Sequence, residues 1–338
     1  SMNQDEIITN PDSPEYQIVK NYTEKLSIVY QRLTQLPNSV NNAYLVQAVE
    51  EANTRVKQSI YIDNTNSNDE LLQLRQELLQ KENKEVDDYL LIGNISLYLY
   101  DYFTSFSAYS CCLSQVSTFN YGQIYLIALT LIHYESYLSA LPLLSSIAQH
   151  LKPPFLQDAH FRLGILYAQQ LDYKKAISEL QSFAPDSIPW VSAQDVILLI
   201  SQTFYLMNDL TLAIRRIETC TTITPAILQH ICFLYLLSNQ TRKFESGISL
   251  LNSHVATKHS PYLLYLRSRL YHKKGQINEA FESMKTAISM KDDEPLFWLA
   301  MGNIYFITQQ FKEAAGCYHQ SMVLDDTMAE AWINYGAT

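Results

Sequence analysis

Large aromatic residues and small residues recur at a fixed interval along the C-terminal part of the chain, with short polar stretches between them. Four pairs of identical residues lie 34 positions apart: Trp298 and Trp332, Gly302 and Gly336, Tyr271 and Tyr305, and Ala280 and Ala314. An interval of this length accommodates two antiparallel helices and the two turns that join them. The pattern therefore predicts stacked helical hairpins, because one such pair cannot bury its apolar face alone.

The residue types within one interval resemble the signature of the tetratricopeptide repeat (TPR). A large residue, a second large residue, glycine and tyrosine occupy the first helix, and a small and an aromatic residue occupy the second: Trp298, Met301, Gly302, Tyr305, Ala314 and Tyr318. We expect the glycine and alanine where the two helices touch, because only small side chains let the backbones approach closely.

Extending this frame backward divides residues 86–338 into repeats that begin near residues 86, 121, 157, 194, 225, 261 and 295, with a truncated eighth near 329. The unit at 225 is expected to contain about three inserted residues around Asn239–Arg242. The predicted fold is all-α, a right-handed superhelical TPR solenoid of seven repeats and part of another.

Residues 1–85 are less regular. Ser1 and Met2 resemble a cloning scar, and residues 1–13 are polar and expected to be disordered. Helices are expected over about 14–36, 40–62 and 70–82, with a polar loop at Asp63–Asp69. Two interpretations of 14–85 stay open: degenerate repeats, or a cap that covers the first repeat.

Composition narrows the class of protein. The 338 residues are 47% hydrophobic and only 17% charged, which excludes a chain that is disordered throughout. The net charge of −10 argues against broad binding to nucleic-acid phosphates. Five cysteines without a CxxC pair favour a reduced, intracellular protein, and no apolar run approaches the ~20 residues that cross a bilayer.

No constellation for catalysis, for a cofactor or for a metal is expected. His133 and Glu135 have the HxE spacing of part of an iron site, but a histidine at a helix end beside a solvated glutamate is the simpler interpretation. His254, His259 and His272 lack a clear fourth zinc ligand. The common phosphate-binding and nucleophile motifs do not occur.

In TPR proteins the first helices line a concave groove, so side chains on that face are the candidates for binding a partner. The predicted residues are Tyr205, Tyr262, Tyr265, Arg269, His272, Lys273, Asn303 and Phe306. Tyrosine and arginine are frequent anchors in interfaces. The alternative is that these aromatic residues belong to the core between repeats. Replacing Tyr265 and Arg269 by alanine distinguishes the two, because groove residues should weaken binding and leave stability nearly unchanged.

Two segments go beyond the generic signature. The stretch Asp158–Tyr167, followed by Asp172 and Tyr173, and the stretch Ala226–His230 resemble the TPR arm shared by the fungal general transcriptional corepressor and the histone demethylase UTX. The segment Tyr262–Ser268 departs from that arm, because it lacks the tryptophan and glycine of the corresponding unit.

This resemblance implies a nuclear, non-catalytic scaffold for corepressor or chromatin-modifying complexes. Its partners would be proteins, among them a Tup-type WD40-repeat corepressor and DNA-bound transcription factors, without direct contact to nucleic acid or membrane. Three alternatives stay open: a cytoplasmic location, a scaffold of another assembly (a cell-cycle ubiquitin ligase, a ciliary coat or an organelle receptor), and the TPR arm of an enzyme whose catalytic domain lies outside these residues.

Overall fold

The computed structural model describes residues 67–153, 155–185, 187–188 and 191–338, and every regular element within these ranges is helical. The expected helices at 14–36 and 40–62 lie outside the described residues. The elements, of which η2 to η4 are 3-10 helices, are α5 (Ser67–Gln80), α6 (Val86–Tyr98), α7 (Tyr102–Cys112), η2 (Leu113–Thr118), α8 (Tyr121–His133), α9 (Tyr137–Ile147), η3 (Ala148–His150), α10 (Phe155–Gln169), α11 (Tyr173–Gln181), α12 (Ala193–Leu206), α13 (Leu210–Ile217), α14 (Pro225–Ser238), α15 (Thr241–Ser253), η4 (Val255–His259), α16 (Pro261–Lys273), α17 (Ile277–Met290), α18 (Pro295–Ile307), α19 (Phe311–Leu324) and α20 (Ala329–Gly336).

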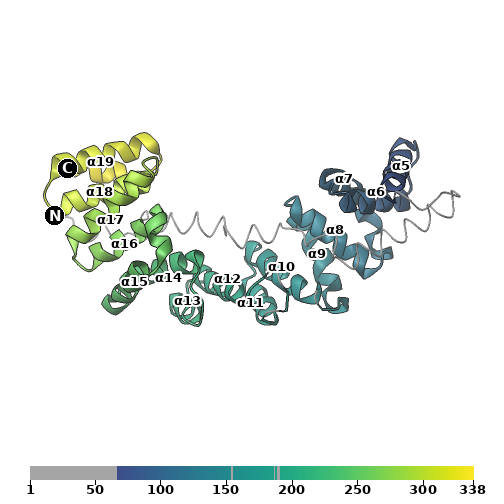
Figure 1. Cartoon of the computed structure of the whole chain (residues 1–338), viewed down its shortest axis with the longest axis horizontal. Helices are drawn as coiled ribbons and strands as arrows, with labels where there is room; N and C mark the ends of the chain where they lie inside the picture. Colours follow the sequence, from purple (N-terminus) through teal and green to yellow (C-terminus); the bar gives the residue numbers. More distant parts are fainter. Residues whose placement is uncertain (1–66, 154, 186, 189–190) are drawn as a thin grey trace. The chain divides into compact units, whose positions relative to one another are not determined.

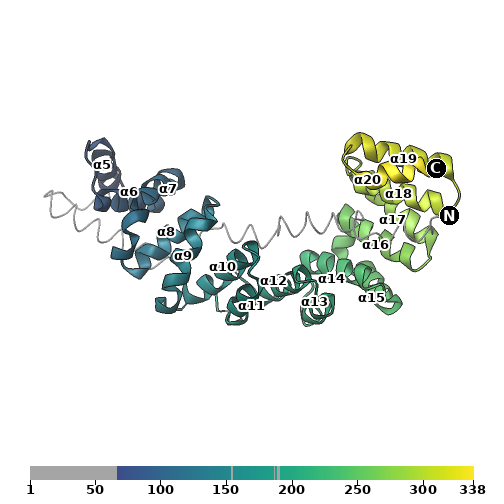
Figure 2. The same ribbon diagram turned by 180° about the vertical axis from the view of Figure 1, so that it is seen from behind.

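Successive helices pair as hairpins, from α6 with α7 to α18 with α19 (Figure 1). Contacts divide the described residues into two compact units, 67–196 and 197–338, and α12 crosses the boundary. Within the second unit, α20 packs against α19 as the first helix of a further pair (Figure 2). The helix expected at 70–82 corresponds to α5, which begins three residues earlier, at Ser67, inside the expected loop. Asp69 in the first turn favours this earlier start, because acidic side chains stabilise a helix N-terminus.

Small residues lie where the two helices of a pair meet, as the signature predicts. A Cβ atom added to Gly302 would lie 2.5 Å from the ring of Tyr318 on the partner helix. At Gly164 an added Cβ would lie 2.5 Å from Cγ of Leu180. Both distances are too short for real atoms, so these two positions admit only glycine unless a neighbour moves.

Serine replaces this glycine in two units without separating the helices. The hydroxyl groups of Ser201 and Ser268 each donate a hydrogen bond of 2.7 Å to a carbonyl on the paired helix, of Ala213 and Ala280 respectively. Each serine is fully buried. The hydroxyl therefore finds an acceptor at the helix contact, which explains why a unit can depart from the glycine of the signature.

The turn inside each hairpin uses the same backbone device. One residue per turn has a positive φ, between 52° and 79°, and the next amide bonds to the carbonyl five residues back in most units, as from Asp101 to Ser96 (2.8 Å). This geometry closes the end of the first helix. The positive-φ residues are Tyr100, Glu135, Leu171, Asn208, Asn239, Gly275 and Gln309.

The unit at 225 departs from the others in its second helix rather than in its turn. Its turn residue Asn239 and the start of α15 have the same spacing from the start of the unit as in the units at 261 and 295. The expected insertion around Asn239–Arg242 is therefore wrong. Buried Phe244 occupies the place of the small residue, and Gly247 faces the first helix one turn later, where its carbonyl accepts a 3.7 Å contact from the thiol of Cys232. Phenylalanine is too large for the helix contact, so the contact shifts by one turn.

A buried ion pair stabilises the first of the two compact units, residues 67–196. Arg162 Nε donates to Asp158 Oδ2 at 2.6 Å, one helical turn away on α10, and the hydroxyl of Tyr125 on α8 donates to the same oxygen at 2.7 Å. Arg162 is 1% exposed and Asp158 is fully buried. The arginine in the segment that resembles the corepressor arm thus joins two repeats through a carboxylate.

Candidate functional site

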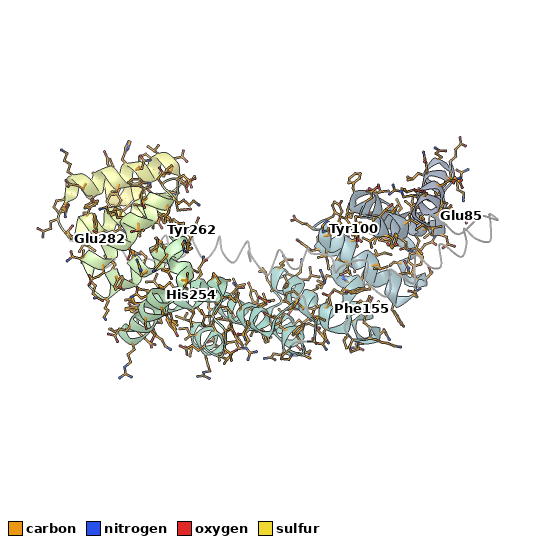
Figure 3. All side chains as sticks on the ribbon, viewed as in Figure 1. Glu85, Tyr100, Phe155, His254, Tyr262 and Glu282 are labelled. Carbon is orange, nitrogen blue, oxygen red and sulfur yellow. The ribbon has the colours of Figure 1, made fainter. Side chains whose placement is uncertain are left out.

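The candidate partner-binding residues lie on the first helices of the second unit, mostly on α16. Tyr262, Tyr265, Arg269, His272 and Lys273 follow one another at three-, four- and one-residue steps, which places them along one face of the helix. Figure 3 labels Tyr262 near the start of α16. The helix α16 packs beside both neighbouring first helices, α14 and α18, and the rings of Tyr262 and Tyr265 contact Phe297 of α18.

Tyr262 is half-buried and belongs to a polar cluster at the junction of two repeats. Its hydroxyl donates to Glu294 Oε2 at 2.7 Å and accepts from Lys291 Nζ at 2.9 Å. The ammonium group of Lys291 also lies 5.0 Å from the centre of the Tyr262 ring. Burial raises the pKa of Tyr262, with a smaller contribution from the bond to Glu294 and against the lowering effect of the bond from Lys291, so the hydroxyl stays protonated as a donor. The hydroxyl therefore already has two partners within the chain.

Tyr265 belongs to the core between repeats. Its ring stacks on Phe297 with centroids 5.4 Å apart, and Phe297 also meets the edge of Tyr262 at 5.4 Å. Tyr265 is 2% exposed and Arg269 is 3% exposed. Removing a buried aromatic ring destabilises a protein by about 3–5 kcal/mol. Because both side chains are buried, replacing Tyr265 and Arg269 by alanine should lower stability, and the expectation that it leaves stability nearly unchanged is wrong.

His272 is a buried histidine in its neutral form. It is 9% exposed, and neither ring nitrogen has a hydrogen-bond partner among the described residues. Burial lowers the pKa of His272 to about 3, with smaller contributions from the charges of Arg269 and Lys273. At neutral pH it thus behaves as an apolar ring, like Phe306 at the corresponding position of the next repeat.

Asn303 is buried within a hydrogen-bond network that spans two repeats. Its Oδ1 accepts from the hydroxyl of Tyr318 at 2.8 Å and from Nδ2 of Asn334 on α20 at 3.0 Å. In the first unit Asn94 accepts from Tyr109 in the same way, at 2.6 Å. Because both carbonyl lone pairs of Asn303 are used, its role in the structure is to join helices.

The remaining three residues retain partly exposed surface. Tyr205 on α12 meets Phe233 on α14 edge-on, with ring centroids 5.7 Å apart. Phe306 meets Phe311 edge-on at 5.4 Å. Lys273 lies half-buried at the last turn of α16. With Tyr262, these side chains have the area that a partner can contact, whereas Tyr265, Arg269, His272 and Asn303 have little.

Sequence reasoning missed Phe297 and the Lys291–Glu294 pair, although all three surround predicted residues. Lys291 and Glu294 lie in the turn between α17 and α18, where a regular repeat pattern carries no information about side-chain direction. Phe297 precedes the Trp298 of the signature, and its aromatic character was the available signal.

The described residues contain no group of three His, Cys, Asp or Glu side chains placed to hold a metal ion. Over the same ranges, every helix is too short or too polar to span a lipid bilayer.

The sequence of residues 261–294 matches the family described as tetratricopeptide repeat. No curated protein is significantly similar to the chain. Among solved structures, a tetratricopeptide repeat protein from Parabacteroides merdae is 12% identical with a TM-score of 0.51, covering 78% of this chain and 99% of that one. A thermophilic TPR protein from Thermus thermophilus is 17% identical with a TM-score of 0.42, covering 54% and 97%. An APC/C hetero-tetramer is 11% identical with a TM-score of 0.47, covering 95% and 69%.

The helical hairpins, the matched repeat and the first of these structures establish the fold as an all-α TPR solenoid. Such repeats typically form non-catalytic scaffolds for protein interactions. Membership of the corepressor and UTX family is not established by these similarities.

Proposed function

We propose that this chain is a non-catalytic scaffold of a nuclear complex for transcriptional repression or chromatin modification. The observation that carries the scaffold role is the run of TPR hairpins, in which the first helices α14, α16 and α18 pack side by side. The nuclear role is supported by the resemblance of Asp158–Tyr167 and Ala226–His230 to the corepressor arm. Its partners are proteins, including a WD40-repeat corepressor and DNA-bound transcription factors.

The mechanism of binding is preorganisation. A side chain that is already held in place loses little conformational entropy when a partner binds. Tyr262 is held by Glu294 and Lys291, and Tyr205 by the ring of Phe233. Partly exposed rings in fixed positions suit a helical or extended segment that lies across several first helices.

Capture from fractionated cell extracts tests this function. The immobilised chain is incubated with nuclear and cytoplasmic extracts, and the bound proteins are identified by mass spectrometry. We expect corepressor and chromatin-modifying subunits from the nuclear extract. Subunits of a ubiquitin ligase, a ciliary coat or an organelle import system would instead overturn the nuclear assignment.

A matched pair of variants separates specific binding from adsorption. Tyr262→Ser with Lys273→Ser changes the face of α16, and Lys285→Ser with Val323→Ser makes a similar change on the second helices α17 and α19. We expect the first pair to lower recovery of nuclear subunits and the second to leave it unchanged. Equal recovery by both pairs would remove α16 from the binding surface.

A further inference from the structure

We propose that a cluster of aromatic side chains at one end of α6, α7 and α8 binds a partner segment that contains arginine or lysine. This aromatic turn cluster consists of Tyr100, Tyr102, Phe103, Phe106, His133 and Tyr134. The inference rests on the proposed scaffold function, names the chemistry of one partner, and places it on the first unit, apart from the α16 face.

Five of the six rings form a continuous chain of contacts across two repeats. Tyr102 meets Tyr100 edge-on at 6.4 Å and His133 at 5.0 Å, and His133 meets Tyr134 at 5.2 Å. Phe106 stacks on Tyr134 with centroids 4.6 Å apart. Four consecutive ring contacts therefore join the turn after α6 to the turn after α8.

Two rings of the cluster are largely exposed to solvent, so they are not part of the buried core. Tyr100 is 54% exposed and Phe103 is 70% exposed. Phe103 and Phe106 are three residues apart on α7, so they lie on the same side of the helix. Figure 3 labels Tyr100, in the turn between α6 and α7. The rings thus offer faces to an incoming group.

The backbone at Tyr100 places its ring at the tip of a hairpin turn. Tyr100 has a φ of 61°, in the left-handed region that glycine and asparagine adopt at low cost. The corresponding turn residue of the unit at 261 is Gly275, and that of the unit at 225 is Asn239. A positive φ is common to the turns of the described hairpins, so the turn itself explains why this side chain is exposed; Tyr100 is the aromatic member of this set of turn residues.

The charge around the cluster selects a cationic occupant. Between Lys84 and Lys152 the sequence has no lysine or arginine. Asp101 lies beside Tyr100 and is paired with Arg75 of α5 at 2.9 Å. Glu135, which follows Tyr134 in the turn, is exposed and forms no ion pair with any described residue. A guanidinium or ammonium group on an aromatic face of this cluster would therefore lie near the turn that carries the Glu135 carboxylate.

The faces of aromatic rings attract cations, and arginine also stacks on them. An apolar segment could use the rings but not the carboxylate, and an acidic segment would be repelled by Glu135. The observations therefore favour a segment in which arginine or lysine side chains alternate with small residues, so that successive cations reach successive rings.

Fluorescence anisotropy with a labelled peptide of alternating arginine and glycine tests this inference on the full chain at physiological salt. We expect Tyr100→Asn with Phe103→Ser to weaken binding about tenfold, because two cation–π contacts are lost while the net charge is unchanged. Asparagine is chosen at position 100 because it tolerates the positive φ. Glu135→Gln should weaken binding a few-fold.

The control is Leu171→Asn with Val323→Ser. Leu171 occupies the corresponding turn of another repeat, with a φ of 62° and 72% exposure, and Val323 is 64% exposed. We expect this pair to bind as the unmodified chain does, and circular dichroism melts should show both pairs folded.

Three results would overturn the inference: equal binding by the aromatic variant, an equal loss in the control, or equal binding of a peptide with glutamine in place of arginine. The assay uses no cellular partner, so failure to capture nuclear subunits would refute the proposed function without affecting this result. Conversely, a chain that captures those subunits but not the peptide would refute this inference alone.

Discussion

Three glycine-to-alanine substitutions in two neighbouring hairpins, α16–α17 and α18–α19, should have three different effects on stability, because the surroundings and backbone conformation differ at each glycine. Gly275 is in the turn between α16 and α17 with a φ of 79°, and no atom lies within 4 Å of an added Cβ. Gly316 lies inside α19 and is also unobstructed. Gly302 is obstructed by the ring of Tyr318.

The magnitudes follow from these differences. Alanine at a left-handed position costs about 1–2 kcal/mol, and the lower entropy of its unfolded chain offsets part of this, so Gly275→Ala should destabilise by about 1 kcal/mol. Gly316→Ala should stabilise by about 0.5–1 kcal/mol, because alanine is the better residue inside a helix.

Gly302→Ala should destabilise by about 1–3 kcal/mol through overpacking. The added Cβ would lie 2.5 Å from Tyr318 Cε1. Tyr318 is 1% exposed and its hydroxyl is bonded to Asn303, so the ring has little room to yield. Relief by a rotation of this ring would also break that hydrogen bond.

Urea unfolding monitored by far-ultraviolet circular dichroism measures the three effects as shifts of the unfolding midpoint. An unchanged slope of the transition shows that a midpoint shift reports a change in stability. The expected order of stability is Gly316→Ala, the unmodified chain, Gly275→Ala and then Gly302→Ala. Stabilisation by Gly275→Ala would refute the positive φ of that turn, and a neutral Gly302→Ala would show that the helix contact is not closely packed.

Three further predictions concern buried groups. Arg162→Ala should destabilise the chain by about 3–5 kcal/mol in a urea melt, because it removes the arginine that pairs with the buried Asp158 carboxylate. Replacing both residues by leucine, Arg162→Leu with Asp158→Leu, should recover most of this loss. Tyr265→Ala should lower the free energy of unfolding by about 3–5 kcal/mol, and a change below about 1 kcal/mol would mean that the ring is not in the core. His272 has a folded-state pKa of about 3 against an ordinary value of 6.5, so between these values the unfolded chain binds more protons and stability falls as the pH is lowered. From pH 7 to pH 5 this histidine should cost roughly 2 kcal/mol, and His272→Phe should remove that part of the acid sensitivity measured by thermal melts.

Much of the fold was predictable because the repeat depends on the spacing of residue types along each helix. The interval of 34 residues and the small residues at the helix contacts depend only on which positions share a helix face. The hairpin helices α8, α14, α16 and α18 begin at Tyr121, Pro225, Pro261 and Pro295, where the frame places the starts of units. Prolines at the first helical position reinforce three of these starts.

The candidate site was less predictable, because spacing does not determine how far a neighbouring repeat covers a helix face. Tyr262 and Tyr265 differ by three residues and looked equivalent in the sequence, yet one is partly exposed and the other is 2% exposed. The ring of Phe297, from the next repeat, stacks on the face of Tyr265 but meets Tyr262 edge-on.

The sequence alone thus determined the hairpins, their order and the positions where only small side chains fit, since these follow from contacts within one repeat. Only the tertiary structure decided which side chains remain open, how Arg162 finds Asp158 and Tyr125, and that Phe244 moves a helix contact by one turn. The physical reason is that exposure and pairing are set by atoms of adjacent repeats, whose packing depends on the volume of every side chain between them.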